Sequence, residues 1–197
     1  MLRTSMLVAL LLGGSMSCSG QLLPVDLSAL RPGPIAVAQS GAELSFAWRD
    51  STNQVWRAEF SLNPAQPLLH EITVDGRVVV HDARPVYRGA VGIRKGGWDA
   101  FFDDPSGEPD GTQRYVAKFA PTGVAVRSVG NRIELSFRGM KMGPFEGELR
   151  YDFYPGTSLM QQVAVMKTSE PNVAYYYDAG LEWTADEDRT PGLNMAS

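Results

Sequence analysis

Cysteine and basic residues are scarce in this sequence. The 197 residues include one cysteine, Cys18, which excludes a disulfide within the chain and a zinc site built from several thiolates. Only 18 lysines and arginines stand against 22 aspartates and glutamates. The resulting formal charge of −4 argues against nucleic acid and against an anionic membrane surface as partners.

The motifs of common catalytic sites are also missing. The sequence has no Gly-x-Ser-x-Gly elbow, no cysteine nucleophile after Cys18 and no glycine-rich phosphate loop before a helix. A carboxylate pair of the glycosidase type stays open, because such pairs come together only in the folded chain. The sequence therefore leaves undecided whether the chain is an enzyme.

The start of the chain has the organisation of an export signal. Arg3 provides a positive charge, residues 6–12 form a short apolar run, and small residues lead to Cys18. This run is shorter than the roughly 20 apolar residues that span a bilayer. The Ser15–Cys18 stretch resembles a bacterial lipobox, whose cysteine is lipidated, although Ser15 stands where leucine is usual. We predict export to the periplasm, the cell envelope or the outside, with either a lipid on Cys18 or plain signal-peptidase cleavage near Ser17 or Gly20 that leaves a soluble protein.

Alternation of apolar and polar residues predicts strands through the rest of the chain, and no long window shows helical spacing. In Phe145–Phe153, apolar or small residues at odd positions alternate with charged residues at even ones. The turn Tyr154–Thr157 follows, and Leu159–Met166 is apolar on both faces, which predicts a central strand covered on both sides. We expect an all-β chain folded as a two-layer antiparallel β-sandwich.

Asp75-Gly76 is a strong hairpin signal, because a type I′ turn needs positive φ at both central residues. If 69–74 pairs with 77–81 across two turn residues, His70 faces His81, and these are the only histidines of the chain. The two rings could share a metal ion or a proton, or form an ordinary half-buried cross-strand pair. Two imidazoles are too few for a structural zinc site, and no cysteine can complete one.

A second two-residue turn, Gly130-Asn131, joins Val124–Val129 to Arg132–Arg138. The implied register pairs Arg127 with Glu134 on one face of the hairpin. The same register places the apolar residues together on the other face: Val124, Val126, Leu135 and Phe137. Both faces agree with the turn, so the sequence predicts this register firmly.

These patterns divide the chain into four segments. Residues 1–20 are the export signal, 21–34 are a linker or an irregular first edge, and 35–184 are the β-sandwich domain. Residues 185–197 form a turn-rich tail, which we expect to lead to a downstream domain.

Two neighbouring stretches are candidates for binding. Four carboxylates lie close together in a glycine- and proline-rich loop, which suits calcium although the spacing is not that of an EF-hand: Asp103, Asp104, Glu108 and Asp110. Exposed aromatic rings can stack on sugars, and the sequence offers one cluster beside this loop: Trp98, Asp99, Phe101 and Phe102. Tyr175–Tyr177 is a second aromatic run. The alternative for each aromatic is the core, and for the loop a solvated connection.

The stretch Tyr151–Gln162 resembles part of the N-terminal β-supersandwich domains, related to galactose mutarotase, that precede catalytic domains in several bacterial glycoside hydrolases. The likeness rests on a strand that ends in a Tyr-Pro-Gly turn and on the long apolar run after it. The resemblance implies a supersandwich-like fold, export and a role beside glycan chemistry. It carries over no catalytic residue, because the mutarotase histidines and carboxylate have no matching motif here.

We therefore expect a non-catalytic β-sandwich module of a secreted or envelope-anchored bacterial glycan-processing protein, which binds carbohydrate or packs on a catalytic domain. One alternative is the N-terminal part of a glycoside hydrolase or related enzyme whose site is completed downstream. Another is a structural domain of a surface lipoprotein. Calcium is the one cofactor that the sequence suggests, and the membrane is a partner only through a lipid at Cys18.

Overall fold

The computed structural model describes residues 21–93 and 112–183, and this part of the chain is built from strands. No helix in it is long and apolar enough to cross a membrane. The strands in chain order are β1 Val25–Ala29, β2 Ala36–Ser40, β3 Glu43–Arg49, β4 Val55–Ser61, β5 Leu69–Val74, β6 Arg77–Ile93, β7 Gln113–Val116, β8 Lys118–Val129, β9 Arg132–Met142, β10 Phe145–Phe153, β11 Met160–Lys167 and β12 Val173–Glu182.

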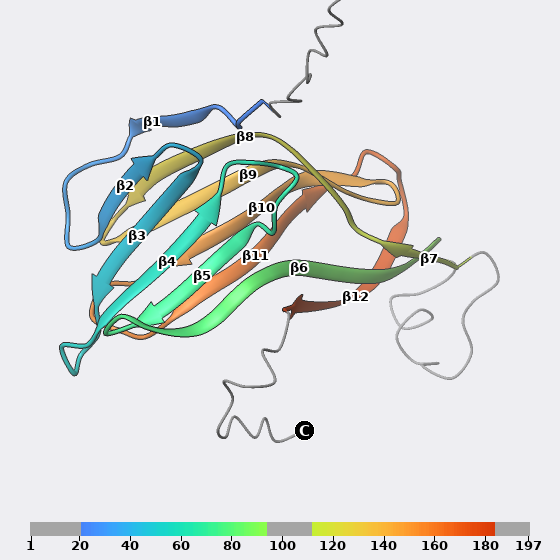
Figure 1. Cartoon of the computed structure of the whole chain (residues 1–197). Helices are drawn as coiled ribbons and strands as arrows, with labels where there is room; N and C mark the ends of the chain where they lie inside the picture. The colour runs from blue at the N-terminus through green and yellow to red at the C-terminus, as the bar shows by residue number, and fades with distance from the viewer. Residues whose placement is uncertain (1–20, 94–111, 184–197) are drawn as a thin grey trace, which may run out of the picture.

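These strands form two sheets that face each other (Figure 1). The five-stranded sheet has the order β1-β8-β9-β10-β11, and the seven-stranded sheet has the order β12-β6-β5-β4-β3-β2, with β7 paired to β6. The pairs are antiparallel except β1 with β8, which run parallel. The predicted all-β class and two-layer sandwich are confirmed.

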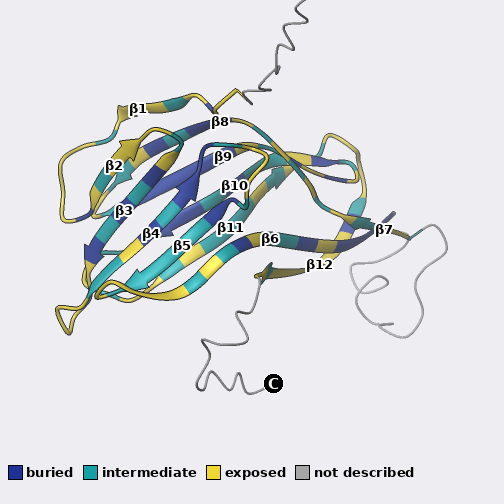
Figure 2. Ribbon diagram, in the orientation of Figure 1, coloured by how far each residue is buried: buried dark blue, intermediate teal, exposed yellow. Residues whose placement is uncertain are grey.

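The core lies between the two sheets and is rich in aromatic rings (Figure 2). Phe46 of β3 stacks on Phe153 of β10 with ring centroids 4.3 Å apart, and Phe60 of β4 meets Tyr151 of β10 at 4.8 Å. All four side chains are fully buried. Because each of these two ring pairs joins a strand of one sheet to a strand of the other, the contacts hold the two layers together.

The predicted strand Phe145–Phe153 is confirmed as β10, with Leu149 and Tyr151 buried on its inner face. Its turn is confirmed too, because Gly156 has a φ of 78°, a conformation open to glycine. The Trp48 indole Nε1 donates a hydrogen bond to the Thr157 carbonyl at 2.8 Å, which ties this turn to the other sheet.

The prediction that Leu159–Met166 is a central strand covered on both sides is wrong. The strand β11 exists, but among the described strands it lies at the edge of its sheet and pairs with β10 alone. Met160, Ala164 and Met166 pack against the core, whereas Val165 on the other face is 40% exposed. The apolar run led to a wrong prediction because single apolar residues are common at protein surfaces, so apolar residues on both faces do not require that both faces be covered.

The structure also redraws two stretches. Val25–Ala29, inside the stretch expected to be a linker or an irregular first edge, is strand β1 at the edge of the five-stranded sheet. The run 77–81 that follows the Asp75-Gly76 turn does not end at His81 but continues through Asp82 to Ile93 as strand β6. Asp82 has a φ of 48°, which is a local change of backbone conformation within this strand.

Candidate functional site

The site residues that the sequence singled out most clearly fall outside the described residues. This applies to the aromatic cluster Trp98, Asp99, Phe101 and Phe102, to the calcium candidates Asp103, Asp104, Glu108 and Asp110, and to Cys18. They stay predictions. The described part of the chain offers three other surfaces.

The first is a pair of exposed tyrosine rings on β12. Tyr175 pairs with Val91 of β6 and Tyr177 pairs with Gly89, so both rings point to the face that carries buried Tyr87. The two tyrosines are 46% and 54% exposed, as Figure 2 shows for their strand. Their ring centroids lie 6.4 Å apart with an angle of 31° between the planes. The two neighbouring, tilted rings form an exposed aromatic surface, which we call the tyrosine platform.

Other aromatic rings support this platform from below and beside it. Phe145 of β10 meets Tyr175 nearly edge to face at 4.9 Å, and Tyr87 lies 6.3 Å from Tyr177. Burial raises the pKa of Tyr87, so its hydroxyl stays protonated across the physiological range. The platform thus rests on neutral, packed aromatic groups.

Gln162 of β11 links the platform strand to the opposite sheet. Its amide Nε2 donates to the Tyr87 hydroxyl at 3.2 Å and to the Gly180 carbonyl of β12 at 3.4 Å, while its Oε1 accepts from the Tyr151 hydroxyl at 2.9 Å. One side chain of β11 therefore bonds to three other strands, β6, β10 and β12. This network holds β12 in place although, among the described strands, it pairs only with β6.

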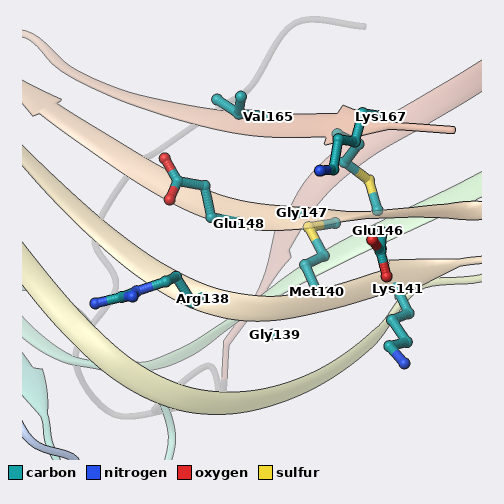
Figure 3. A pocket seen from close by; sticks show the side chains of 10 residues that line it. Arg138, Gly139, Met140, Lys141, Glu146, Gly147, Glu148, Val165 and Lys167 are labelled. Carbon is teal, nitrogen blue, oxygen red and sulfur yellow. The ribbon is translucent and has the colours of Figure 1, made fainter.

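The second surface is a groove of about 450 Å³ on the outer face of the five-stranded sheet (Figure 3). Glycines shape it: Gly139 has a φ of 111° beside a register shift, and a Cβ at Gly147 would clash with the Val165 carbonyl oxygen. Charged side chains of both signs line it: Arg138, Lys141, Glu146, Glu148 and Lys167. Because the groove carries charges of both signs, its lining favours neither an anionic nor a cationic ligand.

On the same two strands as this groove, the buried carboxylates Glu134 of β9 and Asp152 of β10 are paired across the sheet. Burial alone would raise the pKa of Glu134, but hydrogen bonds from Arg132 and Arg127 outweigh it and lower that pKa. Asp152 has its pKa raised, first by burial, and Arg150 offsets this only in part. The predicted pairing of Arg127 with Glu134 is confirmed, with a distance of 2.6 Å from Nε to Oε2.

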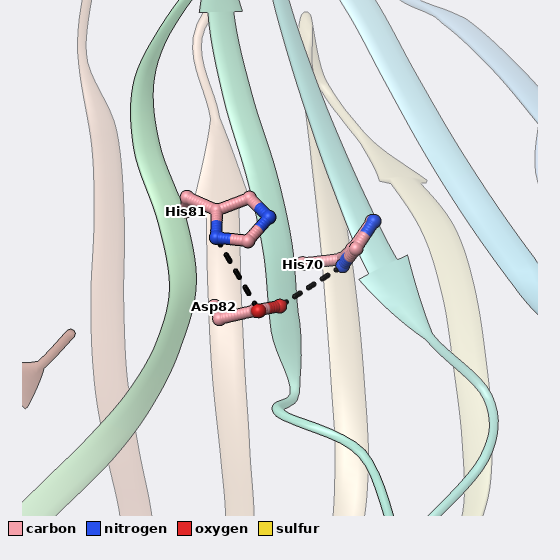
Figure 4. Close-up of side chains that lie close together, drawn as sticks. All are labelled: His70, His81 and Asp82. Atoms are coloured by element: carbon pink, nitrogen blue, oxygen red, sulfur yellow. Dashed lines mark hydrogen bonds and ion pairs between the residues drawn. The ribbon is translucent and has the colours of Figure 1, made fainter. Parts of the chain in front are cut away.

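The third surface is the cluster of both histidines with Asp82 (Figure 4). The predicted Asp75-Gly76 turn is confirmed, with φ of 49° and 78° at its two residues. The predicted pairing of His70 with His81 is wrong. Because Val79 is inserted as a bulge, the register shifts between Ile72 and Thr73, so His81 pairs with Glu71.

The histidines nevertheless meet, and Asp82 is the reason. The register places Asp82 opposite His70, and the two join through a 3.1 Å contact from Nδ1 to Oδ1. The left-handed backbone at Asp82 breaks the alternation of the strand, so the neighbouring His81 also reaches the carboxylate, with 3.3 Å from Nδ1 to Oδ2. The ring centroids lie 5.6 Å apart. The sequence analysis did not identify Asp82 as a partner of the histidines. The only signal was that Asp82 directly follows His81 in the sequence.

No protein-family model and no curated protein matches the sequence.

Proposed function

We propose that this chain is a non-catalytic, carbohydrate-binding β-sandwich module of an exported bacterial glycan-processing protein, and that Tyr175 and Tyr177 carry the binding. The observation that carries the proposal is the tyrosine platform: two half-exposed neighbouring rings, with 31° between their planes, on one face of a strand that ends its sheet among the described strands. Single exposed aromatics are common, but two adjacent rings present the area that a sugar ring can cover.

The chemistry of the platform suits a neutral glycan. The C–H faces of a pyranose ring are weakly positive and stack on the negative face of an aromatic ring. Because Phe145 and Tyr87 pack against the tyrosine rings, these rings lose little conformational entropy when a ligand binds.

Polar groups that can bond hydroxyls stand beside the rings. Each tyrosine has its own hydroxyl, which both donates and accepts hydrogen bonds. Among the described strands, β12 pairs with β6 alone, so its other edge presents main-chain N–H and C=O groups. An apolar surface with a few fixed polar groups is the usual composition of a ligand site.

The sequence supports the cellular setting of the proposal. The predicted export signal would bring the module to the compartment in which bacteria process external glycans. The resemblance of Tyr151–Gln162 to supersandwich domains of glycoside hydrolases points to the same chemistry. A lipid on Cys18 would hold the exported chain at the membrane, whereas plain cleavage of the signal would release it.

The test is electrophoresis of the purified chain through gels that contain soluble polysaccharides, since a bound protein is retarded. We expect retardation by at least one glycan and a loss of at least about tenfold in affinity for Tyr177→Ala, as for an aromatic residue at the centre of an interface. Tyr175→Ala should weaken binding in the same way.

Tyr176→Ala is the matched control. Tyr176 is 44% exposed on the same strand but points to the opposite face, opposite Ala90. Its removal should leave retardation unchanged. If no glycan in a broad panel retards the parent chain, or if all three alanine variants behave alike, the platform does not bind sugars and the packing of β12 against another domain becomes the better account.

A further inference from the structure

We propose that His70, His81 and Asp82 form a binding site for one divalent transition-metal ion of the zinc type. This site lies on β5 and β6 and is independent of the tyrosine platform on β12. The chain has two histidines, and both lie in this cluster.

The geometry of the donor atoms carries the proposal. The Nδ1 atoms of the histidines lie 3.1 and 3.3 Å from the two carboxylate oxygens of Asp82. A tetrahedral ion with bonds of about 2.0–2.2 Å has its ligands about 3.3–3.6 Å apart, so these separations are close to what one shared ion requires. One ligand atom from each of the three side chains lies within 4.8 Å of the other two. Both rings present the same nitrogen to the same carboxylate, as Figure 4 shows.

The backbone supplies a second, separate observation. Asp82 is a non-glycine residue with a φ of 48° inside a 17-residue strand. Such a conformation costs free energy and persists where the surrounding structure demands it, often at ligand sites. Here its effect is specific, because it turns the side chain of Asp82 toward His81 as well as His70.

The ligand types select the class of ion. Imidazole nitrogen suits zinc, copper, nickel and cobalt, whereas calcium and magnesium prefer oxygen ligands throughout. The side chains are 41%, 52% and 32% exposed, so the ion would keep positions open to water. Three protein ligands with an open position differ from the closed four-ligand arrangement of structural zinc sites.

The test is a titration of the full chain with Co²⁺ after treatment with a chelator, followed through the visible absorption of cobalt bound to nitrogen ligands. We expect one equivalent to bind, Zn²⁺ to displace it, and Ca²⁺ to leave it in place. Saturating Zn²⁺ at about 100 times its dissociation constant should raise the melting temperature by about 5–10 °C, because the ion binds only the folded chain.

Variants assign the ligands. His70→Ala and His81→Ala should each weaken Co²⁺ binding by more than about 100-fold. Loss of a residue that only hydrogen-bonds a metal ligand weakens metal binding by at most about 100-fold. Glu71→Gln is the matched control, since Glu71 pairs with His81 but lies outside the cluster, and it should bind like the parent. Absence of cobalt binding by the parent chain would overturn the proposal and leave a hydrogen-bonded His–Asp–His cluster. Undiminished binding by either histidine variant, or a loss in Glu71→Gln, would overturn it as well.

Discussion

The hairpins at Gly130-Asn131 and Asp75-Gly76 both have two-residue turns, but their strands pair differently. The Gly130-Asn131 hairpin keeps its register from the turn as far as the pair of Gly123 with Arg138, and the apolar residues of its inner face are at most 1% exposed: Val124, Val126, Leu135 and Phe137. The Asp75-Gly76 hairpin loses its register at a bulge, and Val78 and Val79 beside its turn are 36% and 37% exposed.

The difference follows from what each hairpin faces. The first is the centre of the five-stranded sheet, so a register slip would move its apolar residues to solvent at a large cost. The second is exposed near its turn, where a bulge costs little and can redirect side chains. Regular pairing thus supports the core, and the irregular pairing in β5 and β6 gathers the histidines around Asp82.

The largest expected effect separates the two hairpins by their cores. Leu135→Asp places a carboxylate in a fully buried position, and we expect a loss of more than about 4 kcal/mol, sufficient to unfold many domains of this size. Val79→Asp places the same group on the exposed bulge and should cost at most about 1 kcal/mol. Urea denaturation followed by tryptophan fluorescence measures both. Equal losses would mean that the bulge is as much part of the core as Leu135.

The next effect concerns the acidic residue of each hairpin. Glu134→Gln removes a buried carboxylate that Arg127 and Arg132 contact, and at pH 7 we expect a loss of about 1–3 kcal/mol. Glu71→Gln changes a half-buried side chain of β5, and it should change the free energy of unfolding by at most about 0.5 kcal/mol.

The pH dependence of Glu134→Gln has a definite sign. The folded pKa of Glu134 is lowered, so the charged carboxylate stabilises the fold above its ordinary unfolded pKa of about 4.3. That contribution is lost as the pH falls through the folded pKa. The difference between parent and variant should therefore shrink below about pH 4. A difference that persists unchanged at low pH would mean that packing, rather than charge, explains the loss.

A smaller effect compares the glycines of the two turns. Gly76 and Gly130 have φ of 78° and 59°, and an added Cβ would meet no atom within 4 Å at either position. Only the backbone conformation then opposes a side chain, so Gly76→Ala and Gly130→Ala should each cost about 1–2 kcal/mol. Thermal denaturation of the two variants decides it. A clearly smaller cost at Gly76 would place the origin of the register shift in the turn itself.

The sequence predicted what depends on local rules. Alternation identified β3, β4 and β10, and the turn residues identified both hairpins, because side-chain period and positive φ are written in neighbouring residues. It failed for β11, whose apolar run suggested a central strand. Strand order depends on contacts between distant segments, so no local pattern reveals that β11 ends its sheet.

The candidate sites were harder to predict for the same reason. The near-contact of His70 with His81 was expected from a register that the structure does not have, and it arises instead from the bulge and from Asp82. The tyrosine run was visible in the sequence, but the support from Phe145 and the link through Gln162 depend on how the two sheets meet. Pairing irregularities and contacts between sheets are properties of the whole fold.

The smallest expected effect concerns Asp82, the residue that most distinguishes the second hairpin. If its left-handed backbone is built into the fold, the metal-free chain should tolerate Asp82→Asn within about 0.5 kcal/mol, because asparagine adopts this conformation readily. Asp82→Ala should cost about 1 kcal/mol more, because alanine bears the strain without a polar side chain to offset it. Both variants lose the charged carboxylate, so their difference isolates the backbone. Melting curves recorded with chelator give the comparison. If alanine and asparagine prove equally destabilising, the contacts of the carboxylate with His70 and His81 hold β6 in this shape, and the backbone conformation is their consequence.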